Sequence, residues 1–386
     1  MRVISSVLGI LICTALTLGA QEDPVRVENG FEGSGAAPRL EQIAYIGEDA
    51  PVPVILADPT FLLFGNEGDL YLPDEKEVTV FHFAPDGTLL GRIGQEGHGP
   101  GEFEIPGEVH FNPRGELVVL DIGSQRQIWF TPQGEFLRSE PIQTTLGDGR
   151  VTVRILDADR RREYLNEHCY LHRMLFFLGP EADELVRRGR MAPPTLLELV
   201  DEEAETVTGF GELRSHEDPI LMSVLNRVHW ALLDADRVVI SWNHYPELGI
   251  YRLNGGVLER LISRRTAFRV NPNPTLEERV LTGPGGSNQI TIIPVVDTVS
   301  LDVAVDRQHR IWVVTMLLDQ EEKDRREDED ELTDMVRLEI FSPEGELLAG
   351  VPLEAFVDHI AFDPEGNLWL MDARYNMSVW KYRVIW

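Results

Sequence analysis

The sequence predicts an all-β protein, a six-bladed β-propeller, from three observations. First, units of roughly 40 residues recur along the chain, and each reads as four short strands, which is typical of propeller blades. Second, six such units fit between Ile55 and Trp386. Third, the last unit has only three strands of its own, and a strand-like segment near the N-terminus can supply the fourth.

The second unit shows the pattern most clearly. An apolar strand ends at the turn 112–115 (Asn-Pro-Arg-Gly), a second strand covers 116–121, and a third covers 127–131. The turn Pro-Gln-Gly at 132–134 then leads into a fourth strand. Proline and glycine mark the turns, whereas β-branched and aromatic residues fill the strands.

The same order recurs in the other units with varying regularity. In the last unit it predicts strands over 359–362, 367–372 and 379–384. The fifth unit carries an acidic insertion, Asp319–Asp334, between its second and third strands. The fourth unit is a degenerate copy. The third, between residues 150 and 213, is the least regular, and only its third and fourth strands are recognisable in TLLELVDEEAETVTGFGEL.

The N-terminal segment 39–49 (RLEQIAYIGED) resembles the fourth strand of the first unit, TLLGRIGQEG at 88–97. We expect it to pair with the last unit and so to close the ring. Closure of this kind removes exposed strand edges, which otherwise invite aggregation.

The first 20 residues have the features of a secretory signal peptide. Arg2 precedes an apolar stretch from Val7 to Leu18, and the small residue Ala20 marks the expected cleavage site. We therefore expect a signal peptide over 1–20, a flexible segment over 21–38 and the propeller domain over 39–386. The mature protein is predicted to be extracytoplasmic, either periplasmic or secreted, without a membrane span, because no later segment is apolar enough.

Net charge limits the partners that we expect, and cysteine content limits the disulfides. The formal net charge of −30 repels nucleic acid and anionic membrane surfaces, so we expect neither as a partner. Cys169 is the one cysteine that remains after signal-peptide removal, so no intrachain disulfide is expected. Packing of a large core must hold the fold together instead.

The second unit resembles an NHL-type repeat. The resemblance implies a six-bladed β-propeller, and it extends recognisably to the first and last units. Because NHL-like propellers include both enzymes and binding platforms, it implies an architecture more strongly than an activity. The usual Asn of the pattern is replaced here by Ser124 and, in the last unit, by Tyr375. The matching residues are Gly99 to Phe103, Pro106, Val109, Pro113, Gly115, Leu117, Val119, Asp121, Arg126, Ile128, Phe130 and Gly134.

The glycine-rich stretch 91–111 raises the alternative of a phosphate-binding loop. Such a loop must lead into a helix N-terminus, where free amides and the helix dipole meet the anion. Here Gly101 leads into EFEIPGEVHF, whose proline and alternating apolar residues indicate a strand. The stretch is therefore predicted to connect the first and second blades.

The first strands of the blades line the central channel, and alignment on the turn that follows each one gives a column of candidate site residues. Two histidines and two carboxylates on one axis have the composition of a metal site or of an acid–base pair. The alternative is a solvated polar channel mouth. No cofactor is predicted other than a Ca or Zn ion held by this column. Its members are Phe61, Glu108, His229, Asp302 and His359.

Three further stretches are weaker candidates. His168 and His172 flank Cys169 and would share one face of a helix, as zinc ligands can, but the alternative is a set of partly buried polar residues in an irregular blade. The charge run 319–334 lacks the spacing of a calcium loop and is predicted to be a solvated insertion on the rim. The stretch 282–291 (TGPGGSNQIT) is expected to be a flexible inter-blade loop, able to cover one face of the channel.

On these grounds the sequence favours a binding module that holds a protein or small-molecule ligand on one face of the propeller. The alternative is a metal-dependent hydrolase or lyase, similar to lactonase-like propellers, in which Glu108, His229, Asp302 and His359 ligate metal or transfer protons.

Overall fold

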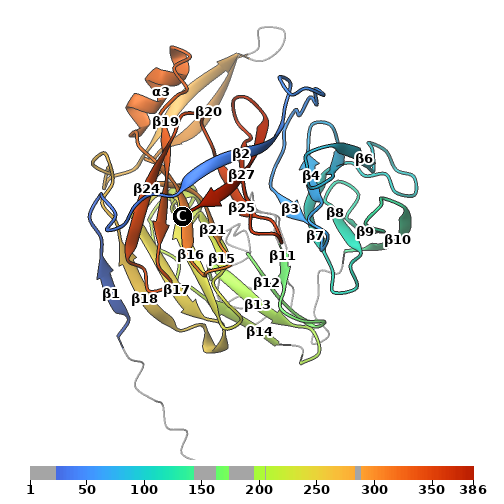
Figure 1. Ribbon diagram of the computed structural model, residues 1–386, viewed down its shortest axis with the longest axis horizontal. Coiled ribbons are helices and arrows are strands. Elements are labelled where there is room, and N and C mark those ends of the chain that lie inside the picture. The colour runs from blue at the N-terminus through green and yellow to red at the C-terminus, as the bar shows by residue number, and fades with distance from the viewer. Residues whose placement is uncertain (1–22, 143–161, 174–194, 205, 283–287) are drawn as a thin grey trace, which may run out of the picture.

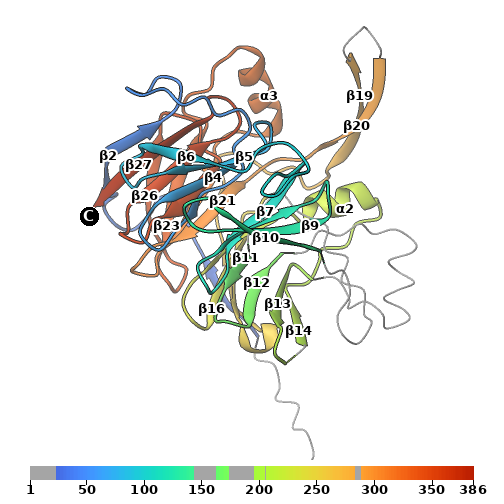
Figure 2. The same cartoon turned by 90° about the vertical axis from the view of Figure 1, so that its right-hand side faces the viewer.

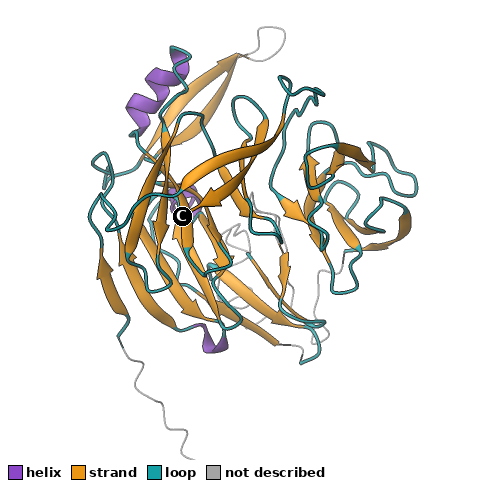
Figure 3. Cartoon of the chain, in the orientation of Figure 1, coloured by secondary structure: helices purple, strands orange, loops and turns teal. Residues whose placement is uncertain are grey.

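The computed structural model describes residues 23–142, 162–173, 195–204, 206–282 and 288–386. The predicted signal peptide lies outside these residues. Within them, four-stranded antiparallel sheets are arranged as six blades around a central channel, with blades 1 and 2 on the right of Figure 1. Strands dominate the structure, and helices are few (Figure 3). The prediction of a six-bladed β-propeller is therefore confirmed.

Blades 1 to 3 are built from consecutive strands, running from the channel outward. Blade 1 comprises β3 (Leu63–Phe64), β4 (Leu70–Asp74), β5 (Thr79–Phe83) and β6 (Leu89–Ile93). Blade 2 comprises β7 (Pro106–Phe111), β8 (Leu117–Asp121), β9 (Arg126–Phe130) and β10 (Phe136–Pro141). Blade 3 comprises β11 (Arg162–Tyr164), β12 (Cys169–His172), β13 (Leu197–Asp201) and β14 (Thr206–Phe210).

Blades 4 to 6 follow the same plan. Blade 4 comprises β15 (Val228–Leu232), β16 (Arg237–Trp242), β17 (Glu247–Arg252) and β18 (Leu258–Ser263). Blade 5 comprises β21 (Ser300–Val305), β22 (Ile311–Met316), β23 (Val336–Phe341) and β24 (Leu347–Leu353). Blade 6 comprises β25 (His359–Phe362), β26 (Leu368–Asp372), β27 (Ser378–Ile385) and the N-terminal β2 (Arg39–Ile46).

Strand β2 closes the ring as the sequence predicts. It pairs antiparallel with β27, from Arg39 opposite Ile385 to Ile46 opposite Val379. The buried side chain of Ile46 packs with Trp369 of blade 6 and Phe81 of blade 1, so the closing strand also contributes to an inter-blade core. The outermost strand of blade 6 therefore comes from the N-terminal part of the chain, and its neighbour β27 from the C-terminal part.

The segment 21–38, expected to be flexible, contributes an element of its own. Residues Val25–Glu28 form β1, which adds in parallel to the outer edge of β18 and extends blade 4 to five strands (Figure 1). Val27 lies against the core shared by blades 4 and 5, which gives the segment an apolar contact. The short alternation Val-Arg-Val-Glu is the sequence signal for this strand.

The core is divided into apolar layers between neighbouring blades. Trp312 and Trp369 are fully buried at the same position of blades 5 and 6. Their indole Nε1–H groups donate to Asp306 and Asp363 at 2.9 and 3.0 Å, so these two buried rings have their polar atom paired. Each acceptor lies in the turn that follows the blade's first strand, so these hydrogen bonds connect each turn to the buried core.

The glycine-rich stretch joins β6 to β7, which confirms the predicted blade connection. Gly94 has a φ of +72°, and a Cβ built on it would lie 2.1 Å from the ring of Phe103. The position therefore requires glycine, both for its backbone conformation and for the close packing of Phe103.

The remaining elements lie outside the blades. Helix α2 (Pro219–Leu225) precedes blade 4, and the 3₁₀ turn η1 (Asn254–Gly256) joins β17 to β18. The acidic insertion of blade 5 contains α3 (Gln320–Asp328), whose N-cap is Asp319. Among the described residues, no helix is long and apolar enough to cross a membrane.

A two-stranded hairpin of β19 (Thr275–Thr282) and β20 (Asn288–Val295) links blades 4 and 5 and projects from the disc near α3 (Figure 2). The expectation of a loop over 282–291 is corrected for Thr282 and for 288–291, which belong to these strands. Residues 290–293 (Ile-Thr-Ile-Ile) are all β-branched, which favours a strand here. Residues 283–287 lie outside the described part of the chain.

Candidate functional site

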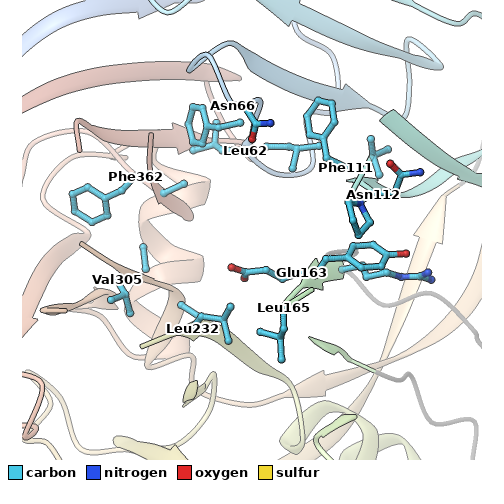
Figure 4. Close-up of a pocket in the computed structure, with 18 of the residues that line it drawn as sticks. Leu62, Asn66, Phe111, Asn112, Glu163, Leu165, Leu232, Val305 and Phe362 are labelled. Atoms are coloured by element: carbon cyan, nitrogen blue, oxygen red, sulfur yellow. The ribbon is translucent and has the colours of Figure 1, made fainter. Parts of the chain in front are cut away.

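A cavity of about 710 Å³ occupies the central channel, at the end where each first strand turns into the second (Figure 4). All six blades contribute to its wall. The residue at the same level of each blade, opposite the start of the second strand, lines it. These residues are Phe64, Phe111, Tyr164, Leu232, Val305 and Phe362. The ring they form is aromatic in four blades and aliphatic in two.

The preceding residue of each first strand decides how much room the cavity has. Blades 4, 5 and 6 have alanine there, at 231, 304 and 361, and all three alanines line the cavity. Blade 3 instead places Glu163 at this level. Its side chain is exposed to the cavity, and Figure 4 shows the carboxylate extending into the middle of the opening. The small residues on one side thus leave space in front of the Glu163 carboxylate.

Glu163 was not predicted as a site residue, because the third unit could not be aligned. Its turn, Leu165-Asn-Glu-His-Cys169, contains neither the proline nor the glycine that anchors the other blades. Only the strand register of the structure, in which Tyr164 pairs with Tyr170, places Glu163 at the alanine level. At this level blade 3 has a charged residue where blades 4, 5 and 6 have alanine.

Arg162, next to Glu163, also lines the cavity wall but is paired. Its Nε lies 2.7 Å from Oε1 of Glu108, and both side chains are buried. His110 approaches the same carboxylate at 2.9 Å. Burial alone would raise the pKa of Glu108, but the Arg162 guanidinium and His110 outweigh it and hold this pKa far below its usual range. Glu108 is therefore a permanent anion that joins blades 2 and 3.

This placement separates Glu108 from the other members of the predicted column. Phe61 is buried in the core between blades 1 and 2. His229, Asp302 and His359 come together across blades 4, 5 and 6. His229 Nδ1 lies 3.4 Å from one carboxylate oxygen of Asp302, and His359 Nδ1 lies 3.7 Å from the other. The column is thus two groups on different sides of the ring.

Asp302 connects two blades through its carboxylate. One oxygen accepts the N–H of Val303 at 2.8 Å, and the other accepts the N–H of Ile360 at 2.9 Å. Because both oxygens already accept backbone hydrogen bonds, the group fits an inter-blade link better than a metal ligand. Within the described ranges, no group of three or more His, Cys, Asp or Glu side chains has the arrangement of a metal site.

His244 lies behind this group and was also not predicted. Its Nδ1 contacts the carbonyl oxygen of Asp297 at 2.8 Å, so this nitrogen carries the hydrogen. Burial lowers the pKa of His244 to about 4, because a charged imidazolium would lose its hydration there. His244 is therefore neutral over the physiological range.

The residues around Cys169 form a strand, not a helix, so the two neighbouring histidines do not share a helix face. His172 is buried, with its Nε2 3.4 Å from Glu198. His168 is exposed, 4.0 Å from the carboxylates of Glu167 and Glu203. Cys169 is a free cysteine whose pKa is raised, first of all by burial.

Comparison with known proteins identifies the fold and no family. No family model and no curated protein matches the chain. A member of the DUF4221 family from Bacteroides vulgatus is 11% identical, with a TM-score of 0.55 over 90% of this chain and 98% of that one. A protein described as exported, from Bacteroides fragilis, is 10% identical, with a TM-score of 0.50 over 93% and 99%. A gluconolactonase from Xanthomonas campestris is 11% identical over 95% and 99%, with a TM-score of 0.48. The first two support the six-bladed propeller assignment, and identities this low extend to nothing beyond the fold.

Proposed function

We propose that this protein is an extracytoplasmic binding propeller that holds a small organic molecule in the cavity at its channel mouth. The observation that carries the proposal is the cavity itself, whose wall combines six inner strands, a ring of aromatic and aliphatic side chains and one inward carboxylate. Its volume of about 710 Å³ is within the roughly 300–1,000 Å³ of small-molecule sites. The location outside the cytoplasm rests on the predicted signal peptide, and the NHL-type relationship rests on the repeat resemblance.

The cavity suits a compact molecule better than a protein loop, because its wall comes from short strands that all belong to the disc. Apolar side chains supply most of the contact, and a few polar groups can fix orientation. Such a site is preformed, so binding does not require the blades to rearrange.

Filling the cavity tests this function. Ala361 is half-buried in the cavity wall, and Ala361→Phe would project a ring into the space without replacing a core residue. We expect 2-phenylethylamine or 2-phenylethanol to bind the wild-type protein in calorimetric titration, and Ala361→Phe to weaken that binding at least about tenfold. Ala204→Trp, on an exposed turn of blade 3, is the matched control. The proposal fails if neither probe binds, or if Ala361→Phe binds them as the wild type does.

A second candidate, favoured by the contact of Asp302 with both His229 and His359, is a hydrolase or lyase with Ca or Zn at this group. Its support is weaker, because Glu108 is paired elsewhere and both Asp302 oxygens accept backbone N–H groups. The test is metal analysis of protein purified without chelator. Stoichiometric Ca or Zn, lost in His229→Ala, would support this function, and melting that is unchanged by added metal and by His229→Ala would contradict it.

A further inference from the structure

The hairpin of β19 and β20 presents an exposed apolar face. Residues that lie directly opposite each other on paired strands point to the same side of the ribbon. Val280 lies opposite Ile290, and Ile292 lies opposite Glu278, so three aliphatic side chains share one face. Val280, Ile290 and Ile292 are 61%, 69% and 49% exposed. Single exposed aliphatic residues are ordinary, whereas a contiguous group of them indicates an interaction site.

The opposite face of the hairpin is the one attached to the rest of the molecule. Arg279 lies on that face, and its guanidinium is 3.3 Å from the carboxylate of Asp324 on α3. Ile293 and Val295 belong to the same face and are half-buried. Because successive residues of a strand point to opposite sides, Val280 points away from this attachment. Figure 2 shows the hairpin extending beyond the disc beside α3, where a partner can approach it.

The hairpin has little support of its own beyond this attachment. Within the part of the chain that the structure describes, β19 and β20 form a two-stranded sheet, and no third strand pairs with either edge. A lone two-stranded hairpin is marginally stable in water, and it gains stability when its apolar face is packed against another element. A partner on the exposed face would supply that packing.

The charge around the exposed face favours a basic partner. Glu278 stands within the apolar group, is exposed, and forms no ion pair with the described residues. The neighbouring acidic insertion, 319–334, holds ten carboxylates and three basic side chains, and all three basic side chains pair with its own carboxylates. The local field therefore attracts cations. A second copy of this chain, with the same net charge of −30, would be repelled.

We propose that the exposed face of the hairpin is a docking surface for a basic polypeptide segment. Apolar side chains of the segment would cover Val280, Ile290 and Ile292, and a lysine or arginine would lie against Glu278. Burial of apolar area supplies affinity, while charge complementarity guides the segment onto the face and selects against acidic partners. No described residue of the hairpin lines the channel cavity, so this inference goes beyond the proposed function and does not depend on it.

A fluorescein-labelled amphipathic peptide of leucine and lysine is the probe. Fluorescence anisotropy at physiological ionic strength measures its binding to the full mature chain. We expect Val280→Ser with Ile290→Ser to weaken binding at least about tenfold, because the peptide then loses its apolar contact. The matched control, Leu90→Ser with Leu137→Ser, removes two exposed leucines from the outer strands of blades 1 and 2 and should leave the affinity within about twofold of wild type.

Glu278→Gln tests the charge of the face separately. It should weaken binding of the lysine peptide about threefold, because an exposed ion pair contributes modestly. Glu344→Gln removes the same charge from an exposed turn of blade 5, at the end of β23 away from the acidic insertion, and should leave the affinity unchanged. All substituted side chains are exposed, so urea unfolding of each variant should match that of the wild type.

Several results would overturn the proposal. A wild-type protein that does not bind the peptide does so, and so does equal weakening by the hairpin double variant and its control, because binding would then follow general surface properties. Equal effects of Glu278→Gln and Glu344→Gln would show net charge alone. A wild-type dimer in sedimentation velocity that Val280→Ser with Ile290→Ser converts to a monomer would assign the face to a second copy. Pelleting with phosphatidylcholine vesicles that the same variant abolishes would assign it to a membrane.

Discussion

Replacing Arg264 by methionine should destabilise the protein strongly, because Arg264 links blade 4 to blade 5 from within the core. The residue follows β18 directly and is 6% exposed. Its guanidinium donates to Thr315 Oγ1 at 2.9 Å and to Glu339 Oε2 at 2.6 Å, and it also bonds Ser300. Methionine preserves most of the apolar stem and removes the charge and these hydrogen bonds.

The size of the stability loss follows from the buried Glu339 carboxylate, which loses one of its two basic partners. Glu339 is 1% exposed, and Arg337 is its other basic partner. Breaking a buried ion pair costs about 3–5 kcal/mol, since the remaining charge is buried without full compensation. Arg337 still compensates one oxygen of the carboxylate, which places the expected loss at the lower end, about 3 kcal/mol.

The pH dependence of the stability difference tests the same prediction independently. Burial alone raises the pKa of Glu339, but Arg264 and Arg337 outweigh it and hold the pKa below its ordinary value. A carboxyl with a lowered folded pKa contributes stability above its unfolded pKa, and this is lost as the pH falls through the folded value. Without Arg264 that contribution shrinks. The difference between wild type and Arg264→Met should therefore be largest near neutral pH and diminish in acid.

The assay is urea unfolding followed by tryptophan fluorescence. The control is Arg252→Met, which breaks the pair with Glu259 where the arginine side chain is 64% exposed, and it should change stability by no more than about 0.5 kcal/mol. A loss below about 1 kcal/mol for Arg264→Met, the net value of one ordinary hydrogen bond, would refute the reasoning.

Three further predictions follow from buried groups and from ring closure. Folded His244 has a pKa of about 4, whereas the unfolded residue titrates near 6.5. The free energy of unfolding should therefore fall by about 3 kcal/mol as the pH is lowered across that interval. His244→Gln should remove this part of the pH dependence of urea unfolding. Gly94→Ala should cost about 2 kcal/mol or more, because its Cβ would overlap Phe103, whereas Gly115→Ala, at a φ of +74° with open space around it, should cost only about 1 kcal/mol. Equal losses would contradict the packing argument. Deleting residues 1–46 removes β2 and exposes the edge of β27, so size-exclusion chromatography should show aggregates, and a monomer that unfolds cooperatively would contradict the closure argument.

Blade boundaries were predictable wherever the sequence has a turn that contains proline or glycine. The strand predicted at 359–362 has the same bounds as β25, because Asp363-Pro-Glu-Gly fixes its end. The inner strand of blade 3 was not predicted, since the turn after Tyr164 contains neither proline nor glycine. Strand β1 was missed for a different reason. Its four residues gain stability from pairing with β18, a partner more than 200 positions away.

The candidate site could be predicted only in part, because alignment on turns gives the level of a residue along the channel and not its direction around it. Residues at one level of a ring are spread over the circumference, and only those on neighbouring blades can touch. His229, Asp302 and His359 belong to consecutive blades and do meet. Glu108 belongs to blade 2 and contacts Arg162 on blade 3 instead. Composition of a column therefore does not by itself indicate a shared centre.

The same geometry sets how much room the cavity has. The inner strands satisfy their backbone hydrogen bonds within each blade, and most of the ring residues at the channel mouth pack from one side against the inter-blade core. Alanine at 231, 304 and 361 enlarges the opening, and Glu163 adds charge to it, while Arg162 of the same strand neutralises Glu108 behind the wall. The room and the carboxylate of Glu163 thus come from different blades, and Glu163 belongs to the blade with the least regular sequence.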